Sequence, residues 1–302
     1  MLKKKSSFKQ FFTVLLCAVL SAAILASCSI DLSSLFEEPK TQYEGKLAMH
    51  VLDVGQGDSI FIELPNGETM LIDAAENYYG EGIIEYIQNA GHKQIDYLIA
   101  THPHTDHIGS MAYIVRNFDV KSVYMPKVAA NTKTYENLLQ AIKKKNLTIK
   151  NGKAGVNILK TDSLSADIIA PVKIDNGNMN NCSIVLKLTF GNRAFLLTGD
   201  AETGEMDTIT ADMHADVLKV GHHGSSTSTS KRILSQIKPQ IAVISCGRYN
   251  DYGHPHKEVL NSLKKANCTV YRTDKNNTVV VSSDGIELNV ETDKESIVRD
   301  GH

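Results

Sequence analysis

The sequence predicts a mixed α/β protein built as a four-layer αββα sandwich, with two sheets packed face to face and helices on the outside. Short β-type runs and helical periodicities follow one another in the order strands, helices, strands, helices, which is the order expected of that architecture. The length of 302 residues and the hydrophobic content of 42% allow a full core. No break in composition divides the chain, so we expect one large domain at residues 46–291.

The first half of the domain is expected to open with a β-meander, because short apolar runs are joined by glycine-containing turns. Ile83, Ile84 and Ile87 recur at helical spacing and indicate a helix that ends at Gly91. The other elements expected here are strands at 46–53, 59–64, 69–73, 95–101 and 122–125, and helices at 111–118 and 135–145.

The second half is expected to begin with strands and to end with two strand–helix units and a hairpin. The hairpin would turn at Asp284-Gly285, a dipeptide typical of tight turns. The expected strands are at 156–159, 166–170, 183–190, 194–198, 216–220, 241–245, 268–272 and within 279–290, and the expected helices are at 231–237 and 258–266.

The N-terminus indicates export from a bacterial cytoplasm. Lysines at positions 3 to 5 precede an apolar stretch at 11–26, which has the length of a signal peptide rather than of a stable membrane span. The segment Leu25-Ala26-Ser27-Cys28 resembles the lipobox of bacterial lipoproteins, which implies a signal peptide at 1–27 and lipid on Cys28. An uncleaved N-terminal anchor is the alternative. We expect a tether at 28–45, a C-terminal tail at 292–302, and a domain held at the outer face of the cytoplasmic membrane.

Charge and cysteine content narrow the possible functions. Removal of residues 1–27 takes away four of the 32 basic residues and none of the 34 acidic ones. The net charge of the remaining chain is then 28 − 34 = −6. That balance argues against a generally basic nucleic-acid-binding protein. Nine lysines and one acid, Glu136, nevertheless lie between residues 121 and 160, either as a solvated helical face or as a contact for a polyanion. Cys182, Cys246 and Cys268 predict buried thiols rather than a disulfide framework.

A cluster of metal-ligand residues follows the expected strand at 95–101. His102, His104, Asp106 and His107 lie within six residues. Neutral imidazoles and carboxylates hold zinc, manganese or iron while leaving positions open for water and substrate. The cluster therefore predicts a metal site.

Four later stretches also carry ligand-type residues at expected strand ends. Asp200 follows a strand and could bridge two cations or cap a helix. His222 and His223 are adjacent, so their side chains are expected to point in opposite directions and only one to bind metal directly. The last two stretches hold histidines at 254 and 256, which could contact substrate or cap a helix, and an asparagine at 180 in a turn.

The segment His102-Pro103-His104-Thr105-Asp106-His107 matches the HxHxDH signature and resembles the metallo-β-lactamase fold, a hydrolase superfamily. Further motifs occur in the order seen in the metallo-β-lactamase-like domain of ComEC-type competence proteins, at residues 52–59, 180–185, 196–200, 218–225 and 253–256. The resemblance covers about residues 46 to 290. It implies a metal-dependent hydrolase that holds two divalent ions, zinc or manganese.

The resemblance also implies a ligand set. His102, His104 and Asp200 would form the first metal site, and Asp106, His107, Asp200 and either His222 or His223 the second. His223 is favoured, because His223-Gly224-Ser225 is similar to the His-x-Ser ending of phosphodiesterase branches, and Ser225 would then contact substrate. No histidine lies between His107 and His214, so the usual third histidine of the first site is missing. Asn180 becomes a candidate weak ligand or substrate contact, and manganese becomes plausible.

The expected chemistry is hydrolysis by a metal-activated water. Asp106 would orient or deprotonate that water, and His254 would protonate the leaving group or hold a phosphate oxygen. Asp58 and Asp73 would support the metal-binding imidazoles from behind. The resemblance implies a phosphodiesterase or nuclease that acts on DNA, nucleotides or phosphodiester wall polymers. An acyl or lactam hydrolase, or a non-catalytic binding module with the same fold, are the alternatives.

Overall fold

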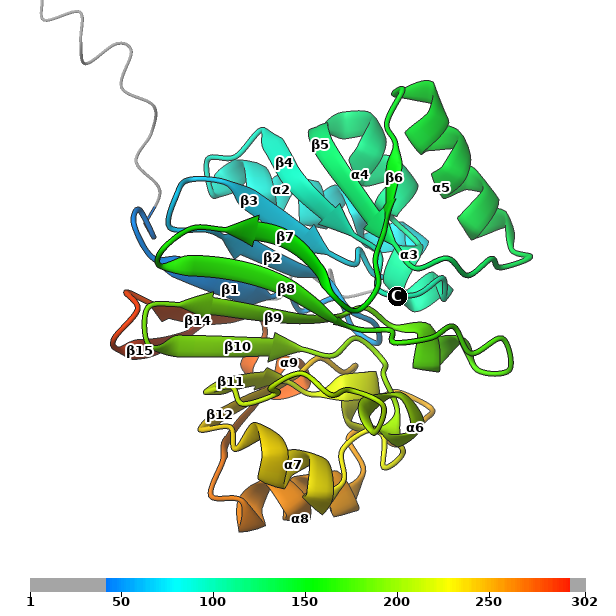
Figure 1. Ribbon diagram of the computed structural model, residues 1–302. Helices are drawn as coiled ribbons and strands as arrows, with labels where there is room; N and C mark the ends of the chain where they lie inside the picture. The colour runs from blue at the N-terminus through cyan, green and yellow to red at the C-terminus, as the bar shows by residue number, and fades with distance from the viewer. Residues whose placement is uncertain (1–41, 294–302) are drawn as a thin grey trace, which may run out of the picture. The chain divides into compact units, whose positions relative to one another are not determined.

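A computed structural model describes residues 42–293 as two β-sheets between two layers of helices (Figure 1). The expected αββα architecture is confirmed. The expected signal peptide, Cys28 and nearly all of the tether lie outside the described residues, as does most of the expected C-terminal tail. Among the described residues, no helix has the length and apolar character needed to cross a membrane.

The first sheet has eight strands in the order β15-β14-β1-β2-β3-β4-β5-β6. Strands β3 to β6 run parallel to one another, and the neighbours from β15 to β3 pair antiparallel. The strands are β1 (Leu47–Val51), β2 (Ile60–Glu63), β3 (Thr69–Ile72), β4 (Gln94–Ile99), β5 (Asp119–Met125), β6 (Ile149–Asn151), β14 (Val279–Ser283) and β15 (Leu288–Thr292).

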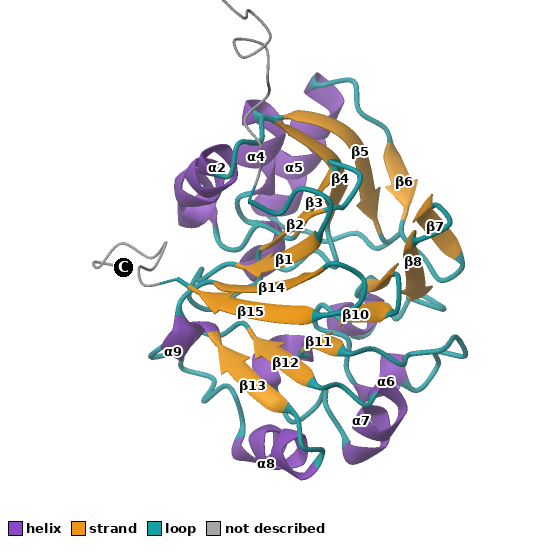
Figure 2. Ribbon diagram, turned by 90° about the vertical axis from the view of Figure 1, so that its left-hand side faces the viewer, coloured by secondary structure: helices purple, strands orange, loops and turns teal. Residues whose placement is uncertain are grey.

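The second sheet has seven strands in the order β13-β12-β11-β10-β9-β8-β7, seen with the first sheet in Figure 2. Strands β10 to β13 run parallel, whereas β7, β8, β9 and β10 pair antiparallel. The strands are β7 (Val156–Lys160), β8 (Leu164–Ala170), β9 (Val185–Phe190), β10 (Arg193–Leu197), β11 (Val217–Lys219), β12 (Ile241–Ile244) and β13 (Thr269–Arg272).

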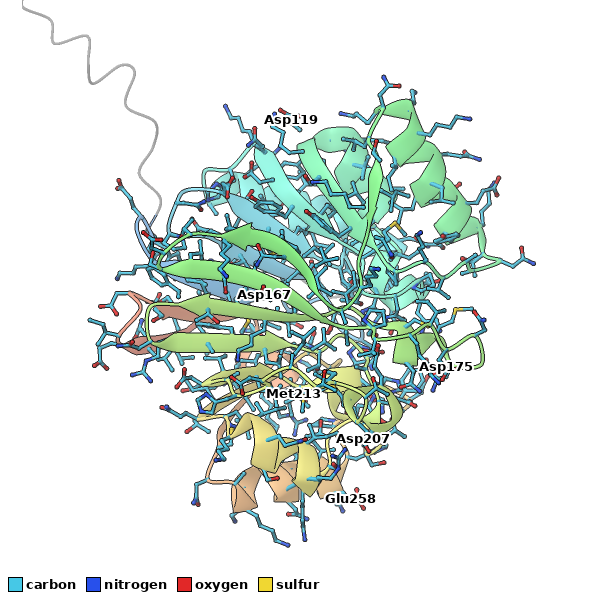
Figure 3. All side chains as sticks on the ribbon, viewed as in Figure 1. Asp119, Asp167, Asp175, Asp207, Met213 and Glu258 are labelled. Carbon is cyan, nitrogen blue, oxygen red and sulfur yellow. The ribbon has the colours of Figure 1, made fainter. Side chains whose placement is uncertain are left out.

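Helices cover the outer faces of both sheets. Side chains of α2 (Gly80–Asn89), α4 (Met111–Asn117) and α5 (Lys133–Lys144) pack on the first sheet. Those of α7 (Lys231–Ile237) and α8 (Lys257–Lys265) pack on the second. In Figure 3, Asp119 at the start of β5 and Glu258 in α8 accordingly lie at opposite ends of the stack.

Three apolar layers hold the sandwich together. The central layer joins the inward faces of the two sheets, with residues such as Met49 and Ile62 from one sheet and Leu188 and Phe195 from the other. Each outer layer joins a sheet to its helices. Alternate residues of a strand point to opposite faces, so β-strands buried on both sides read as continuous apolar runs. Cys182, Cys246 and Cys268 are buried free thiols, as expected.

The expected elements of 95–101, 111–118, 231–237 and 258–266 occur within one or two residues of their expected ends. Several short elements were not expected: β6, α3 (Thr105–Ile108), α6 (Thr203–Met206), α9 (Thr273–Asn276), and 3-10 turns that include η2 (Asn77–Tyr79), η3 (Met179–Cys182) and η4 (Gly221–Gly224). Elements of three or four residues are too short to establish a periodicity. α3 begins at Thr105, so Asp106 and His107 of the metal-ligand cluster lie in a short helix, whereas His102 and His104 precede it.

The carboxyl ends of the parallel strands meet at one edge of the sandwich. Asp73 follows β3, the cluster from His102 follows β4, Asp200 follows β10, and the histidine pair at 222 and 223 follows β11. A backbone hydrogen bond from Ile184 to the Thr101 carbonyl joins the two sheets there. Ligands bind preferentially outside the carboxyl ends of parallel strands, and this edge brings the candidate site residues together.

Candidate metal centre

Asp200 lies at the middle of the site. Its Oδ2 atom is within 4 Å of the Nε2 atoms of four histidines. The distances are 3.3 Å to His107, 3.6 Å to His223, 3.8 Å to His222 and 3.9 Å to His102. Four imidazole nitrogens directed at one carboxylate oxygen make an arrangement that suits a bridging metal ligand.

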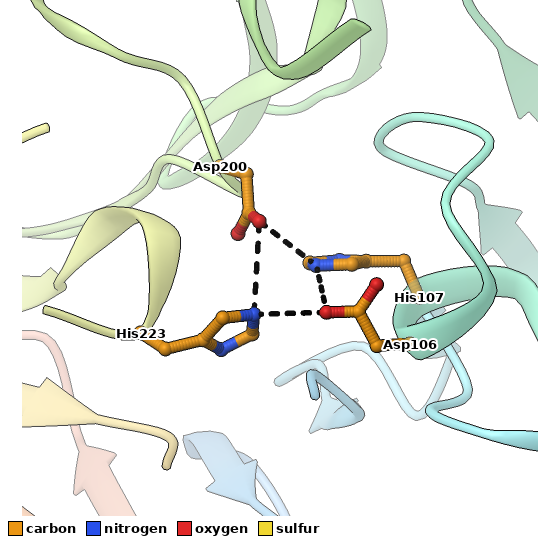
Figure 4. A group of neighbouring side chains, drawn as sticks. All are labelled: Asp106, His107, Asp200 and His223. Atoms are coloured by element: carbon orange, nitrogen blue, oxygen red, sulfur yellow. Dashed lines mark hydrogen bonds and ion pairs between the residues drawn. The ribbon is translucent and has the colours of Figure 1, made fainter. Parts of the chain in front are cut away.

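Asp106 and His104 extend this centre on two sides. Asp106 Oδ2 lies 3.3 Å from His223 Nε2 and 3.8 Å from His107 Nε2, so Asp106, His107, Asp200 and His223 form one compact group (Figure 4). His104 Nδ1 lies 2.9 Å from His102 Nε2. The structure therefore brings the residues assigned to the second metal site into one group. For the first site, it places His102 beside Asp200 and His104 beside His102.

Asp73 supports His107 from behind. Its Oδ2 accepts a hydrogen bond from His107 Nδ1 at 2.7 Å and another from the Thr101 hydroxyl at 2.6 Å, while the Thr101 backbone N–H donates to Oδ1. These contacts direct His107 Nε2 towards Asp200. A carboxylate behind a metal-binding imidazole holds its orientation and its tautomer.

Asp58 supports His223 in a similar way, and a buried lysine completes this arrangement. Asp58 Oδ1 lies 3.5 Å from His223 Nδ1, which also hydrogen-bonds to the Ser245 carbonyl at 3.1 Å. Lys219 Nζ donates to Asp58 Oδ2 at 2.7 Å, and the Lys219 side chain is fully buried. Lys219, Asp58 and His223 thus form a chain of contacts that leads to Asp200.

His102 is held by hydroxyl groups rather than by a carboxylate. The Thr101 hydroxyl lies 3.2 Å and the Ser183 hydroxyl 3.4 Å from His102 Nδ1. Ser183 also accepts a hydrogen bond from the Asp200 backbone N–H. Ser183 therefore connects the cluster after β4 with the loop after β10.

His222 and His223 do not point in opposite directions, contrary to the expectation from strand geometry. Both Nε2 atoms face Asp200. Both residues have left-handed backbone angles, with φ of 49° and 54°, inside η4 instead of the alternating geometry of a strand. Such conformations cost energy in non-glycine residues and cluster at functional sites. His222 Nδ1 contacts Glu202, and the Asn180 amide lies beside both Glu202 and His222.

The remaining candidate substrate contacts lie around the histidine pair at 222 and 223. The His254 and His222 ring centres are 5.7 Å apart, and Gln56 Nε2 lies 3.4 Å from His254 Nδ1. Ser225 is buried, and its hydroxyl contacts Thr227. His256 accepts a hydrogen bond from the Ser226 backbone, so it braces the loop after η4.

Glycine at position 57 allows the loop after β1 to approach the metal-ligand cluster. Gly57 has a φ of 143°, and a Cβ atom there would lie 2.5 Å from the Asp106 carbonyl oxygen. The next residue, Asp58, donates its backbone N–H to that oxygen at 3.1 Å. Only glycine permits this close approach, which brings Asp58 to His223.

Burial and opposite charge act against each other at this centre. Burial alone would lower the pKa of both His107 and His223, but carboxylates led by Asp200 raise the pKa of His107 well above its usual value and that of His223 to about 10. Burial would raise the pKa of Asp200, but His107 and His223 hold it well below the usual range. Protons on the two imidazoles balance the carboxylates when no cation is bound, and a bound cation would replace them.

The residues present fit divalent metal ions. Asp200 Oδ1, Asn180 Oδ1 and His107 Nε2 are buried without a hydrogen-bond partner among the described residues. The large majority of buried polar atoms in proteins have a hydrogen-bond partner, so three partnerless atoms around one centre suit a bound ligand. The donors are imidazole, carboxylate and amide groups without thiolates, a set that suits zinc, manganese or iron.

A sequence model described as the metallo-beta-lactamase superfamily matches residues 52–248. The chain belongs to this superfamily. The match covers β2 to β12 and the loops that carry His102, Asp200 and His222. A hydrolase fold with a candidate metal site is therefore established for this chain.

Curated relatives come from the competence branch that the motifs indicated, which confirms the expected resemblance. "ComE operon protein 3" of Bacillus subtilis (strain 168) is 35% identical over 272 residues, covering 83% of this chain and 35% of that protein. "Recombination protein 2" of Haemophilus influenzae is 30% identical over 228 residues, covering 74% of this chain and 27% of that protein. The chain spans about a third of the length of these relatives.

Solved structures that are similar to this one include two proteins of low sequence identity. A diphosphatase from the PhnP family is 14% identical with a TM-score of 0.49, covering 79% of this chain and 97% of that one. The metallo-beta-lactamase fold protein YhfI from Bacillus subtilis is 10% identical with a TM-score of 0.48, covering 74% and 95%.

Sequence reasoning missed Lys219 and Glu202. Lys219 is a lone charge in an otherwise apolar strand, and that contrast is a usable signal of a buried ion pair. Glu202 lies in the polar segment after Asp200, where nothing in the sequence separates it from solvent-exposed acids.

Proposed function

We propose that the chain is an extracytoplasmic, metal-dependent phosphodiesterase that hydrolyses DNA, nucleotides or phosphodiester-linked wall polymers. The observation that carries the proposal is the convergence of four imidazoles and Asp106 on Asp200. The relative named "Recombination protein 2" favours a nucleic acid among these substrates. Lipid on Cys28 would hold the domain at the outer face of the cytoplasmic membrane.

Asp106 is suited to act on the attacking water. Its side chain is 30% exposed, whereas that of Asp200 is 3% exposed, so Asp106 is the carboxylate that solvent can reach. His107 and His223 hold the pKa of Asp106 below its usual range although burial opposes them, so it is an acceptor at neutral pH. Divalent cations, when bound, would activate water and stabilise negative charge on a phosphoryl oxygen.

We assign the contact with the leaving group to His254. It lies on the loop after β12, beside His222 and His223, and its ring stacks on Tyr252 with an interplanar angle of 18°. Asn250 accepts a hydrogen bond from the His254 backbone and donates one to its carbonyl. These contacts hold the His254 ring at the rim of the centre.

Two lysines at the same edge favour a polyanionic substrate. Lys127 follows the carboxyl end of β5 and Lys153 follows that of β6, and both are exposed. Strands β4, β5 and β6 run parallel, so these lysines lie at the edge where β4 delivers His102. Lys143 and Lys144 form the C-terminal end of α5. The next residue, Lys145, contacts the Phe118 carbonyl just before β5, so this lysine pair lies at the opposite edge of the sheet.

Hydrolysis assays test the proposal. Protein loaded with manganese or zinc is given bis-p-nitrophenyl phosphate, single-stranded DNA and nitrocefin, and the two phosphodiesters are expected to be cleaved. Cleavage of nitrocefin alone would favour a lactam hydrolase. Cleavage of none of the three by metal-loaded protein would contradict the proposal and favour a binding module.

The lysine pair provides a matched comparison. Lys127→Gln/Lys153→Gln is expected to weaken DNA binding and to lower the slope of log affinity against log salt by about 1.4, from about 0.7 per phosphate contact on single strands. Lys143→Gln/Lys144→Gln changes the net charge equally at the opposite edge and is expected to leave the slope unchanged. Equal changes of the salt slope in the two double variants would mean that Lys127 and Lys153 belong to a solvated surface and make no specific contact with DNA.

A further inference from the structure

We infer that His222 is the third imidazole ligand of the first metal position, in place of the histidine that is missing between His107 and His214. This inference rests on the metal-dependent function proposed above. It gives each of the two adjacent histidines a separate role, with His223 at the second position beside Asp106 and His222 at the first position with His102 and His104.

The contacts of His222 repeat the pattern of the other two carboxylate-supported histidines. His107 has Asp73 at Nδ1, His223 has Asp58 at Nδ1, and each directs Nε2 towards Asp200. His222 has Glu202 Oε1 at 3.3 Å from Nδ1 and Asp200 Oδ2 at 3.8 Å from Nε2. A proton held on Nδ1 by a carboxylate leaves the Nε2 lone pair for a metal.

Glu202 is itself held in place. Its Oε2 accepts a hydrogen bond from Asn178 Nδ2 at 2.8 Å, and its Oε1 accepts one from the Thr227 hydroxyl at 3.0 Å. Asn180 Nδ2 lies 3.4 Å from the same Oε1 atom. Polar groups from η3 and from the loop after η4 thus fix the carboxylate behind His222, as expected of a built ligand site rather than a mobile surface pair.

The position of His222 also matches the first site. It lies outside the compact group of Asp106, His107, Asp200 and His223, although its Nε2 atom faces the same Asp200 oxygen. It also lies beside Asn180, in the turn that leads to Ser183 and hence to His102. Asn180 and Ser183 thus link His222 to His102.

Asn180 is the competing candidate for this role. Its Oδ1 atom is buried without a hydrogen-bond partner among the described residues, so it could reach a cation. Its amide nitrogen, however, is directed at Glu202 and His222, at 3.4 and 3.5 Å. Imidazole is also the better ligand for first-row metals such as zinc, so His222 is assigned as the primary ligand and Asn180 as its neighbour.

Metal stoichiometry tests the assignment without reference to activity. Metal-free protein is titrated with manganese by calorimetry, and electron paramagnetic resonance reports whether the bound ions form a coupled pair. The wild type is expected to bind two ions as a coupled pair, and His222→Ala is expected to bind one uncoupled ion. Glu202→Gln is expected to bind two, with the weaker site losing about 10- to 100-fold in affinity.

His214→Ala is the matched control, because His214 is an exposed histidine on the loop before β11, and it should bind manganese as the wild type does. The single ion retained by His222→Ala would report an intact fold. The assignment is overturned if His222→Ala keeps both ions or loses both, or if the wild type binds only one ion. It is also overturned if Asn180→Ala, and not His222→Ala, loses the coupled pair of ions. A protein that binds two ions but hydrolyses no phosphodiester would contradict the proposed function and leave this assignment intact.

Discussion

Replacing Lys219 with methionine tests the ion pair beneath the metal centre. Lys219 Nζ lies 2.7 Å from Asp58 Oδ2, and the two side chains are 0% and 1% exposed. Methionine keeps an unbranched side chain but removes the charge, so the Asp58 carboxylate stays buried with its main cation gone. Breaking a buried pair in this way costs about 3 to 5 kcal/mol. That is a large part of the total stability of a domain, which is about 5 to 15 kcal/mol.

Urea denaturation followed by circular dichroism measures this cost. Lys187→Met is the matched control, because Lys187 Nζ lies 2.8 Å from Asp212 Oδ2 but the Asp212 side chain is 76% exposed. Its loss is expected to cost less than about 1 kcal/mol. Adding Asp58→Asn to Lys219→Met removes the stranded charge and should recover at least about 1 kcal/mol relative to the sum of the single variants. The reasoning is refuted if Lys219→Met costs no more than Lys187→Met, or if the two changes are additive.

Two further predictions concern buried or crowded positions. Burial raises the pKa of Glu205 from 4.5 to about 9, so the folded state holds a proton that the unfolded state releases. The free energy of unfolding is therefore expected to fall between about pH 4.5 and pH 9, by at most about 1.4 kcal/mol per pH unit. Urea midpoints from pH 5 to 9 should show a flatter profile in Glu205→Gln, and an unchanged profile would contradict the assignment. Gly109→Ala is expected to cost about 1 to 3 kcal/mol, because its Cβ would lie within 2.6 Å of backbone atoms of residues 75 to 77. Gly177→Ala, whose Cβ would meet only Asp175 Oδ1 at 3.4 Å, should be nearly neutral in the same measurement.

Much of the fold could be predicted because its signals are local. The runs at 95–101 and 231–237 carry clear strand and helix patterns, and the order of such runs indicates the layers. Short elements such as β6 could not be predicted, because β6 is specified by pairing with β5 and not by its own three residues. Tertiary pairing of this kind leaves no mark in a single sequence.

The candidate site could be predicted in part for the same reason. His102, His104, Asp106 and His107 lie close together in the sequence, and Asp200 follows a recognisable strand. The direction of His222 could not be predicted, because it depends on the left-handed backbone of η4. Glu202 and Lys219 act through contacts that the tertiary structure creates, 20 residues before His222 and 161 residues after Asp58 in the sequence.

Hydrolysis of bis-p-nitrophenyl phosphate by the wild type and by Asp200→Asn, each with saturating manganese, tests the central claim most directly. The claim is that Asp200 lies at the middle of a metal-dependent hydrolytic centre. The wild type is expected to be active only with metal, and Asp200→Asn is expected to lose at least about a hundredfold in kcat/KM, since even residues behind the ligands cost 10- to 100-fold. Metal-dependent activity that survives in Asp200→Asn would place the catalytic centre elsewhere and contradict the account.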